Sequence, residues 1–219
     1  MKLEGVRFLL FDLDGTLILP GTDFRAMREE VKQLFVDAGV PADFPFRHIL
    51  GGTEDACDWL VAQGRDPAEV QELKRGAYAF VEAREWEGLA RAREIEGVRE
   101  ALAHWRRSYT LGIFTRTHPD VLRESIAKFD LGPFDVLLSR ADGPPKPDPA
   151  QCRLALERAG VGPEATLAVG DHAFDVQSAR GAGVRCVGVL TGSGTREELE
   201  REGAVLVVPA LPHLRAYLA

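Results

Sequence analysis

Short apolar segments recur along this chain, with helical patterns between them. A short, nearly continuous apolar run is typical of a strand buried on both faces, as in a parallel sheet. Strands that alternate with helices imply right-handed crossovers, so the pattern predicts an α/β fold with a doubly wound parallel sheet. The runs cover residues 6–11, 109–115, 135–139, 166–170 and 185–190, with a weaker sixth at 204–208.

Proline and capping residues indicate where several of the intervening helices begin. Pro119 suits the first turn of a helix, and Pro149 opens a helical segment that stops at Gly160. Thr195 and Glu198 have the spacing of a capping box. These signals place helices directly after the second, third and fifth apolar runs.

The interval between the first two apolar runs is far longer than the others. A parallel crossover needs only about a dozen residues, yet this interval extends over residues 16–108. Helical patterns occupy it at Phe24–Phe35, Thr53–Gln63 and from Pro67 toward Trp86. We expect an inserted helical domain. It forms either a lid over the carboxyl ends of the strands or a peripheral bundle with no role in binding.

Charge and cysteine content restrict the partners and the compartment. The chain has 27 Lys and Arg against 34 Asp and Glu, a formal charge of −7. An acidic surface offers no general footprint for nucleic acid or anionic lipid, so we expect neither as a partner. Cys57, Cys152 and Cys186 lie in apolar stretches, which is typical of buried thiols in a reducing compartment. The first apolar run is too short for a signal peptide or membrane span. We expect a cytoplasmic protein, monomeric or homodimeric.

Pairs of carboxylates follow two of the apolar runs. Asp12 and Asp14 come directly after the first, and Asp171 and Asp175 follow the fourth. Carboxylates held close together at the end of a buried strand are costly unless a cation or hydrogen bonds compensate. Mg²⁺ prefers oxygen ligands and suits this setting. Asp171 is a candidate ligand of the same metal, and Asp175 would hold a metal-bound water or orient a lysine. Taken singly, each pair also fits a turn or a helix start.

A hydroxyl and cations follow two further runs. Thr115 closes the second run and precedes Arg116, a combination suited to binding an anion. Lys146 lies within Gly143–Pro149, a segment that contains four prolines and therefore presents the lysine at low ordering cost. The alternative is a solvated lysine in a connector. Together the strand ends are expected to bring carboxylates, a hydroxyl and a cation to one crevice.

Taken in chain order, the residues that follow these four apolar runs resemble the motifs of the haloacid dehalogenase superfamily of phosphotransferases. The inserted helices look like the cap of its phosphoglycolate phosphatase-like subgroup. The resemblance implies a Rossmann-like phosphatase core at residues 1–18 and 89–219 with a helical cap at 19–88. It rests on Asp-x-Asp-x-Thr at 12–16, Thr at 115, Lys-Pro-x-Pro at 146–149 and Gly-Asp-x-x-x-Asp at 170–175.

The resemblance also implies a mechanism for hydrolysis of a small phosphorylated metabolite. Asp12 would attack phosphorus and form an aspartyl-phosphate, while Asp14 would protonate the leaving oxygen and then take a proton from water. Thr115 and Lys146 would hold the phosphoryl oxygens. Mg²⁺ would be bound by the Asp12 carboxylate, the Asp14 backbone carbonyl and Asp171.

Several residues depart from the family pattern or lie outside it. Arg116 stands where the family often has Asn, and His172 where a small hydroxyl residue is common. Within the cap, Arg47–Thr53 combines a cation with glycines before a predicted helix, so Arg47 is a candidate substrate contact, together with Arg116 and Thr16. Gly192–Gly194 lacks the full spacing of a dinucleotide-binding loop.

Other functions remain open on the sequence alone. A sugar-phosphate mutase of the same superfamily needs the same core. A dehalogenase has no use for the metal carboxylates. A signalling receiver accepts phosphate on an aspartate but needs no inserted lid, and a silent phosphate-binding protein would show no turnover.

Overall fold

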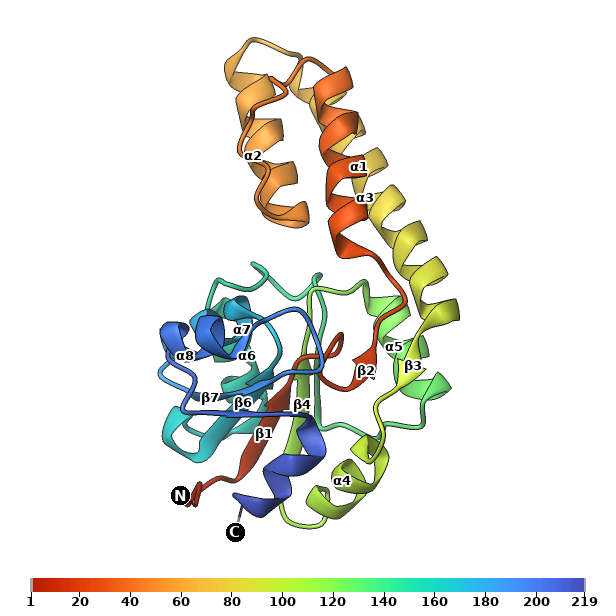
Figure 1. The fold of residues 1–219 in the computed structure, drawn as a ribbon. Coiled ribbons are helices and arrows are strands. Elements are labelled where there is room, and N and C mark those ends of the chain that lie inside the picture. Colours follow the sequence, from red (N-terminus) through yellow and green to blue (C-terminus); the bar gives the residue numbers. More distant parts are fainter. Residues whose placement is uncertain (1, 219) are drawn as a thin grey trace. The chain divides into compact units, whose positions relative to one another are not determined.

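The chain folds into two compact units. The computed structural model describes residues 2–218. One unit comprises the chain up to Pro20 and from Ala92 onward, and the other comprises Gly21–Arg91 (Figure 1). The sequence analysis placed the edges of the insert at residues 19 and 88. The structure places them at Gly21 and Arg91. Residues 18–19 pair with residues 93–94 of the larger unit, and the last helix of the insert continues to Arg91.

The larger unit is built on a six-stranded parallel sheet, which confirms the predicted α/β doubly wound fold. The strand order is β5-β4-β1-β6-β7-β8, and each neighbouring pair is parallel. Each strand lies within one of the six apolar runs: β1 Phe8–Phe11, β4 Thr110–Phe114, β5 Val136–Leu138, β6 Thr166–Gly170, β7 Arg185–Val189 and β8 Leu206–Val208.

Helices connect the strands and cover the sheet. Pro119 begins one of them, Gly160 follows another in a left-handed conformation, and Thr195 forms the predicted capping box with Glu198. The helices are α4 Val98–Trp105, α5 Pro119–Lys128, α6 Ala150–Ala159, α7 Ala173–Gly181 and α8 Arg196–Glu202, with short 3₁₀ helices η1 at Pro163–Ala165 and η2 at Leu211–Ala216.

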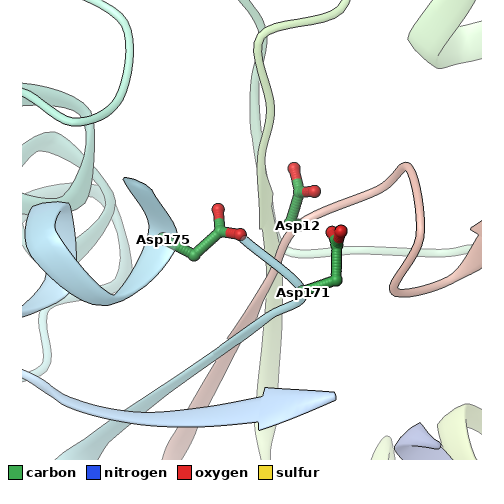
Figure 2. Close-up of side chains that lie close together, drawn as sticks. All are labelled: Asp12, Asp171 and Asp175. Carbon is green, nitrogen blue, oxygen red and sulfur yellow. The ribbon is translucent and has the colours of Figure 1, made fainter. Parts of the chain in front are cut away.

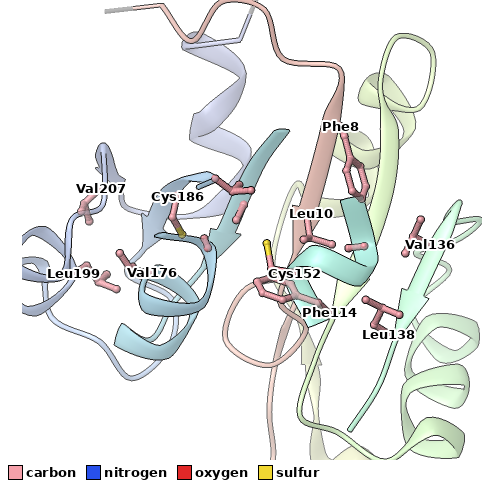
Figure 3. Packing of buried hydrophobic residues seen from close by; sticks show 14 residues of the cluster. Phe8, Leu10, Phe114, Val136, Leu138, Cys152, Val176, Cys186, Leu199 and Val207 are labelled. Atoms are coloured by element: carbon pink, nitrogen blue, oxygen red, sulfur yellow. The ribbon is translucent and has the colours of Figure 1, made fainter. Parts of the chain in front are cut away.

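The central strand β1 is buried on both faces. Phe8 and Leu10 belong to a core cluster that includes residues of α6, α7 and α8 (Figure 3). Phe11 stacks instead on Trp105 of α4, with 6.0 Å between ring centroids. All four residues of β1 are buried, which explains why its sequence is apolar without alternation.

The order of the strands determines where a ligand can bind. From β1 the chain passes to β4 and β5 on one side, and then returns to β6, β7 and β8 on the other. In open α/β sheets, ligands bind outside the carboxyl ends of the strands at such a reversal. A ligand-binding site is therefore expected at the residues that follow β1, β4 and β6.

The inserted unit is all helical and has a hydrophobic core of its own. It contains α1 Phe24–Asp37, α2 Ile49–Ala62 and α3 Pro67–Arg91. Its core is a cluster of buried side chains that includes Met27, Val31, Phe35, Leu60 and Val81.

A short pair of strands, which the sequence analysis did not predict, joins the larger unit to the insert. Strand β2 Ile18–Leu19 pairs antiparallel with β3 Arg93–Glu94. The chain therefore leaves and re-enters the larger unit through adjacent segments.

Two sequence-based expectations about cysteines and membranes can be compared with the structure. Cys57, Cys152 and Cys186 are buried free thiols, as predicted. Among the described helices, none combines the length and apolar character needed to cross a membrane.

Candidate active site

The loop after β1 turns at Gly15, directly against the side chain of Asp171. Asp12 continues the strand, since its amide donates to the carbonyl of Val169 on β6 at 2.9 Å, and the residue is 8% exposed. Gly15 has a φ of +80°, and a Cβ there would lie 2.7 Å from Cγ of Asp171. Only glycine allows both this backbone conformation and this close approach.

Lys146 joins the ends of two strands through its ammonium group. Its Nζ donates to Oδ1 of Asp12 at 2.7 Å and to Oδ1 of Asp175 at 2.5 Å. The same atom lies 4.2 Å from the ring centroid of Phe114, at the end of β4. The side chain is buried. Burial lowers the pKa of Lys146, but the charges of Asp12 and Asp175 outweigh this effect and raise it, which keeps the amine protonated.

Asp171 and Asp175 occupy the end of β6 and the first turn of α7. Asp175 forms a capping box with His172, whose amide donates to Oδ2 at 2.9 Å. Asp171 accepts a hydrogen bond at Oδ2 from the amide of Ser193 at 2.8 Å. A Cβ at Gly192 would lie 1.9 Å from that same oxygen. The segment after β7 therefore wraps closely around Asp171.

Three buried carboxylates converge at this edge of the sheet. One oxygen from each of Asp12, Asp171 and Asp175 lies within 4.8 Å of the others (Figure 2). Burial raises the pKa of Asp12 to about 8 and that of Asp171 to about 7, and Asp175 adds to both shifts. The carboxylates are thus incompletely compensated by Lys146. An all-oxygen set of this kind fits a hard divalent cation such as Mg²⁺.

Asp14 faces a different set of partners. Oγ1 of Thr117 donates to Oδ2 of Asp14 at 2.9 Å, and the hydroxyls of Thr115 and Thr117 are also 2.9 Å apart. Burial raises the pKa of Asp14, while the hydrogen bond from Thr117 and the charge of Lys146 oppose the rise. The hydrogen bond from Thr117 therefore distinguishes the Asp14 carboxyl from those of Asp12 and Asp175, which accept from Lys146.

A cationic and aromatic cluster lies beside the acidic group. The guanidinium carbon of Arg116 is 5.2 Å from the ring centroid of Phe174. The ring of His172 packs edge-on against the ring of Phe174, with 4.3 Å between centroids. Arg116 directly follows buried Thr115, and Phe174 directly precedes buried Asp175. The cluster is therefore built from the ends of β4 and β6, and the end of β6 also carries Asp171 and Asp175.

The structure brings four of the predicted site residues into one group. Asp12, Lys146, Asp171 and Asp175 form one contact group. Thr16 is fully buried, and its hydroxyl has no hydrogen-bond partner within residues 2–218. The contact of Thr16 with substrate stays a prediction.

Arg47 belongs to the helical unit, where it is exposed two residues before α2. Its contact with substrate stays a prediction. The predicted loop around it is shorter than expected, because Gly51 and Gly52 lie inside α2 instead of before it. Gly52 packs against Phe46, where a Cβ would lie 2.9 Å from the ring. This contact explains a glycine within the helix.

The sequence indicated Thr117 only as a further hydroxyl for anion binding, and neither its contact with Asp14 nor that of Ser193 with Asp171 was predicted. Thr117 follows Thr115 at the two-residue spacing that puts side chains on one side of an extended segment, which was the available signal. Ser193 belongs to Gly192–Gly194, which was considered only as a dinucleotide-binding loop. The structure gives it a different role, as the donor to Asp171.

Comparisons with known proteins agree with this geometry. Residues 9–189 match the family model of the haloacid dehalogenase-like hydrolases. A phosphoglycolate phosphatase of Pseudomonas putida is 31% identical over 94% of this chain and 77% of its own. A glyceraldehyde 3-phosphate phosphatase of Pyrococcus furiosus is 26% identical over 97% of this chain and 92% of its own.

The fold is also shared with solved structures. A haloacid dehalogenase-like hydrolase from Bacteroides fragilis superimposes with a TM-score of 0.71 at 22% identity, covering 95% of this chain and 99% of its own. The matched family model spans the strand ends that carry the acids, from β1 to β7. On this evidence the chain belongs to the haloacid dehalogenase-like hydrolase family.

Proposed function

We propose that this protein is a Mg²⁺-dependent phosphatase that hydrolyses a small phosphomonoester through an aspartyl-phosphate on Asp12. The observation that carries the proposal is the contact between the buried ammonium of Lys146 and Asp12, beside Asp171 and Asp175. A carboxylate nucleophile needs positive charge around it before an anionic phosphoryl group can approach. The phosphatase names of the two sequence relatives support the same activity.

The carboxylates of Asp12, Asp171 and Asp175 would hold the metal, together with the backbone carbonyl of Asp14. When bound, Mg²⁺ supplies charge neutralisation for the transferring phosphoryl group. Lys146 supplies a second positive charge and separates the charges of Asp12 and Asp175, which it contacts directly. Thr115 offers a buried hydroxyl for a phosphoryl oxygen.

The two aspartates after β1 would divide the chemistry. Asp12 attacks phosphorus while Asp14 gives its proton to the leaving oxygen, and Asp14 then accepts a proton from the water that hydrolyses the aspartyl-phosphate. The separate hydrogen-bond partners of the two carboxyls support this division, since Lys146 contacts Asp12 and Thr117 contacts Asp14.

The remainder of the substrate would meet cationic groups. We assign Arg116 to this role in the larger unit and Arg47 in the helical unit, which would act as a cap that excludes water. The substrate class is a small phosphorylated metabolite. A cytoplasmic location and a monomeric or homodimeric state complete the proposal.

The test is a panel of small phosphorylated metabolites, assayed for release of inorganic phosphate with Mg²⁺ and with EDTA. The wild-type protein should release phosphate from at least one member, and EDTA should abolish the release. Asp12→Asn should lower kcat/KM by roughly 10³-fold or more while keeping the wild-type circular dichroism spectrum.

Other outcomes would contradict the proposal. Full turnover by Asp12→Asn would reject the nucleophile. Isomerisation of a sugar phosphate without phosphate release would indicate a mutase. Stable phosphorylation without turnover would indicate a receiver.

A further inference from the structure

We propose that Thr117 is a positioning residue that determines which oxygen of Asp14 carries the proton transferred to the leaving group. The inference rests on the proposed function, because it concerns the acid of that same reaction. It starts from a contact between segments far apart in the sequence, in which Oγ1 of Thr117 donates to Oδ2 of Asp14 at 2.9 Å.

Thr117 is held firmly enough to act in this way. Its side chain is 5% exposed, and its backbone carbonyl accepts from the amide of Arg140 at 3.2 Å. Its own amide donates to Oγ1 of Thr115 at 3.3 Å. A buried side chain with an anchored backbone loses little further freedom when it makes a hydrogen bond, so the contact with Asp14 is preorganised.

The hydrogen bonds have a direction. A threonine hydroxyl has one proton to donate, and that of Thr117 is given to Asp14. Without substrate, Thr115 is therefore the donor in the 2.9 Å contact between the two hydroxyls and Thr117 the acceptor. When a phosphoryl oxygen binds, the hydroxyl of Thr115 would donate to that oxygen instead, and the bond from Thr117 to Asp14 is kept. The result is a directed chain from Thr115 through Thr117 to Oδ2 of Asp14.

This chain distinguishes two oxygens that are otherwise equivalent. Oδ2 accepts from Thr117, so the transferable proton of Asp14 resides on Oδ1. When Asp12 forms its bond to phosphorus, the bond from phosphorus to the ester oxygen breaks and its electron pair stays on that oxygen. The proton on Oδ1 then moves to the same oxygen and Asp14 becomes a carboxylate. In the second step water adds to phosphorus, the bond to Asp12 breaks and Asp14 recovers a proton from the water.

Loss of the hydroxyl should therefore affect substrates according to their leaving groups. An alkoxide leaves poorly without a proton, whereas p-nitrophenolate is a stable anion and hardly needs one. General acid catalysis is worth about 10² to 10⁴-fold. We expect Thr117→Val to lower kcat/KM for an alkyl phosphate such as glycerol phosphate by about 10 to 100-fold, less than the full contribution of the acid, because Asp14 itself is kept.

The same variant should change kcat/KM for p-nitrophenyl phosphate by less than about 3-fold, since that reaction gains little from an acid. The ratio kcat/KM is the right measure because it covers only the steps up to departure of the leaving group. Thr117→Ser keeps the hydroxyl and should restore the alkyl phosphate to within a few-fold of wild type. Asp14→Asn sets the largest difference that can be expected between the two substrates.

A matched control is available on the same sheet. Thr166 is also buried, and its hydroxyl donates at 2.9 Å to the carbonyl of Gly162, the residue before η1. Thr166 begins β6, at the opposite end of the strand from the acids. Thr166→Val should lower kcat/KM for both substrates by the same factor or leave both unchanged. Thermal unfolding of every variant separates lost fold from lost activity, and Thr117→Ala replaces Thr117→Val if valine prevents folding.

The inference is overturned if Thr117→Val lowers kcat/KM for both substrates equally or changes kcat/KM for neither. It is also overturned if Thr117→Ser fails to restore kcat/KM for the alkyl phosphate. These outcomes differ from failure of the proposed function. In that case the wild-type protein itself releases no phosphate from either substrate, and the role assigned to Thr117 falls with it.

Discussion

Single residues at the strand ends carry the electrostatics of this site. Lys146 is the clearest case, because its ammonium contacts Asp12 and Asp175 while its side chain is buried. Removal of one partner from a buried ion pair leaves the other uncompensated, and this costs about 3 to 5 kcal/mol. The lysine therefore contributes to the fold as well as to the proposed chemistry.

Lys146→Met should lower the free energy of unfolding by about 3 kcal/mol in EDTA, at the lower end of that range, because Asp12 can take up a proton when the ammonium is lost. Urea unfolding at neutral pH measures the change. Mg²⁺ should recover part of the loss, since a divalent cation compensates the same carboxylates. An unchanged unfolding midpoint in EDTA would contradict the assigned role. Arg158→Met is a control, since its ion pair with Asp142 is partly exposed and pairs near the surface contribute about 1 kcal/mol or less.

At the scale of elements, the segment after β7 is a close support for the end of β6. A Cβ at Gly192 would lie 1.9 Å from Oδ2 of Asp171, where an ordinary contact is not possible. We expect Gly192→Ala to displace this carboxylate, to lower kcat/KM by about 10-fold or more and to raise the Mg²⁺ concentration needed for half-maximal activity.

Gly76→Ala is the matched control for this substitution. Gly76 lies in α3, and a Cβ there meets no atom within 4 Å among the described residues. Alanine should leave kcat/KM unchanged and stabilise the protein by up to about 1 kcal/mol. If both glycine variants behaved alike in activity and metal requirement, the close approach at Gly192 would not matter.

The elements that the sequence predicts best are those with a continuous local signal. The apolar runs locate all six strands of the parallel sheet. Asp12 and Asp171 were identified from their positions at the ends of two of these strands. The β2 and β3 pair was not predicted, because each strand has two residues and depends on a partner far away in sequence. The start of α2 was missed because Gly51 and Gly52 are poor helix formers, and their environment appears only in three dimensions.

The contacts around the acids illustrate the same limit. Asp14 was expected to act as an acid, but the hydrogen bond from Thr117 joins residues that are 103 positions apart. Likewise Ser193 reaches Asp171 from a loop that the sequence analysis compared only with a dinucleotide-binding loop. Spacing along the chain identifies which residues reach an edge of the sheet. Only the fold shows which of them touch.

On the scale of the whole molecule, the chain divides its tasks between two units with separate cores. The sheet unit contains the acids and Lys146, and the helical unit is inserted between β2 and β3. The inserted position leaves the sheet and its strand order intact. The proposed chemistry therefore lies in the sheet unit.

The chemical step itself can be observed by trapping the enzyme during turnover. The protein is mixed with a substrate from the panel and Mg²⁺, quenched in acid within one turnover, and digested for peptide mass spectrometry. We predict one added phosphoryl group on Asp12, which disappears on a longer incubation and is absent from Asp12→Asn. A phosphoryl group on another residue, or rapid phosphate release by Asp12→Asn, would contradict the assignment of Asp12 as the nucleophile.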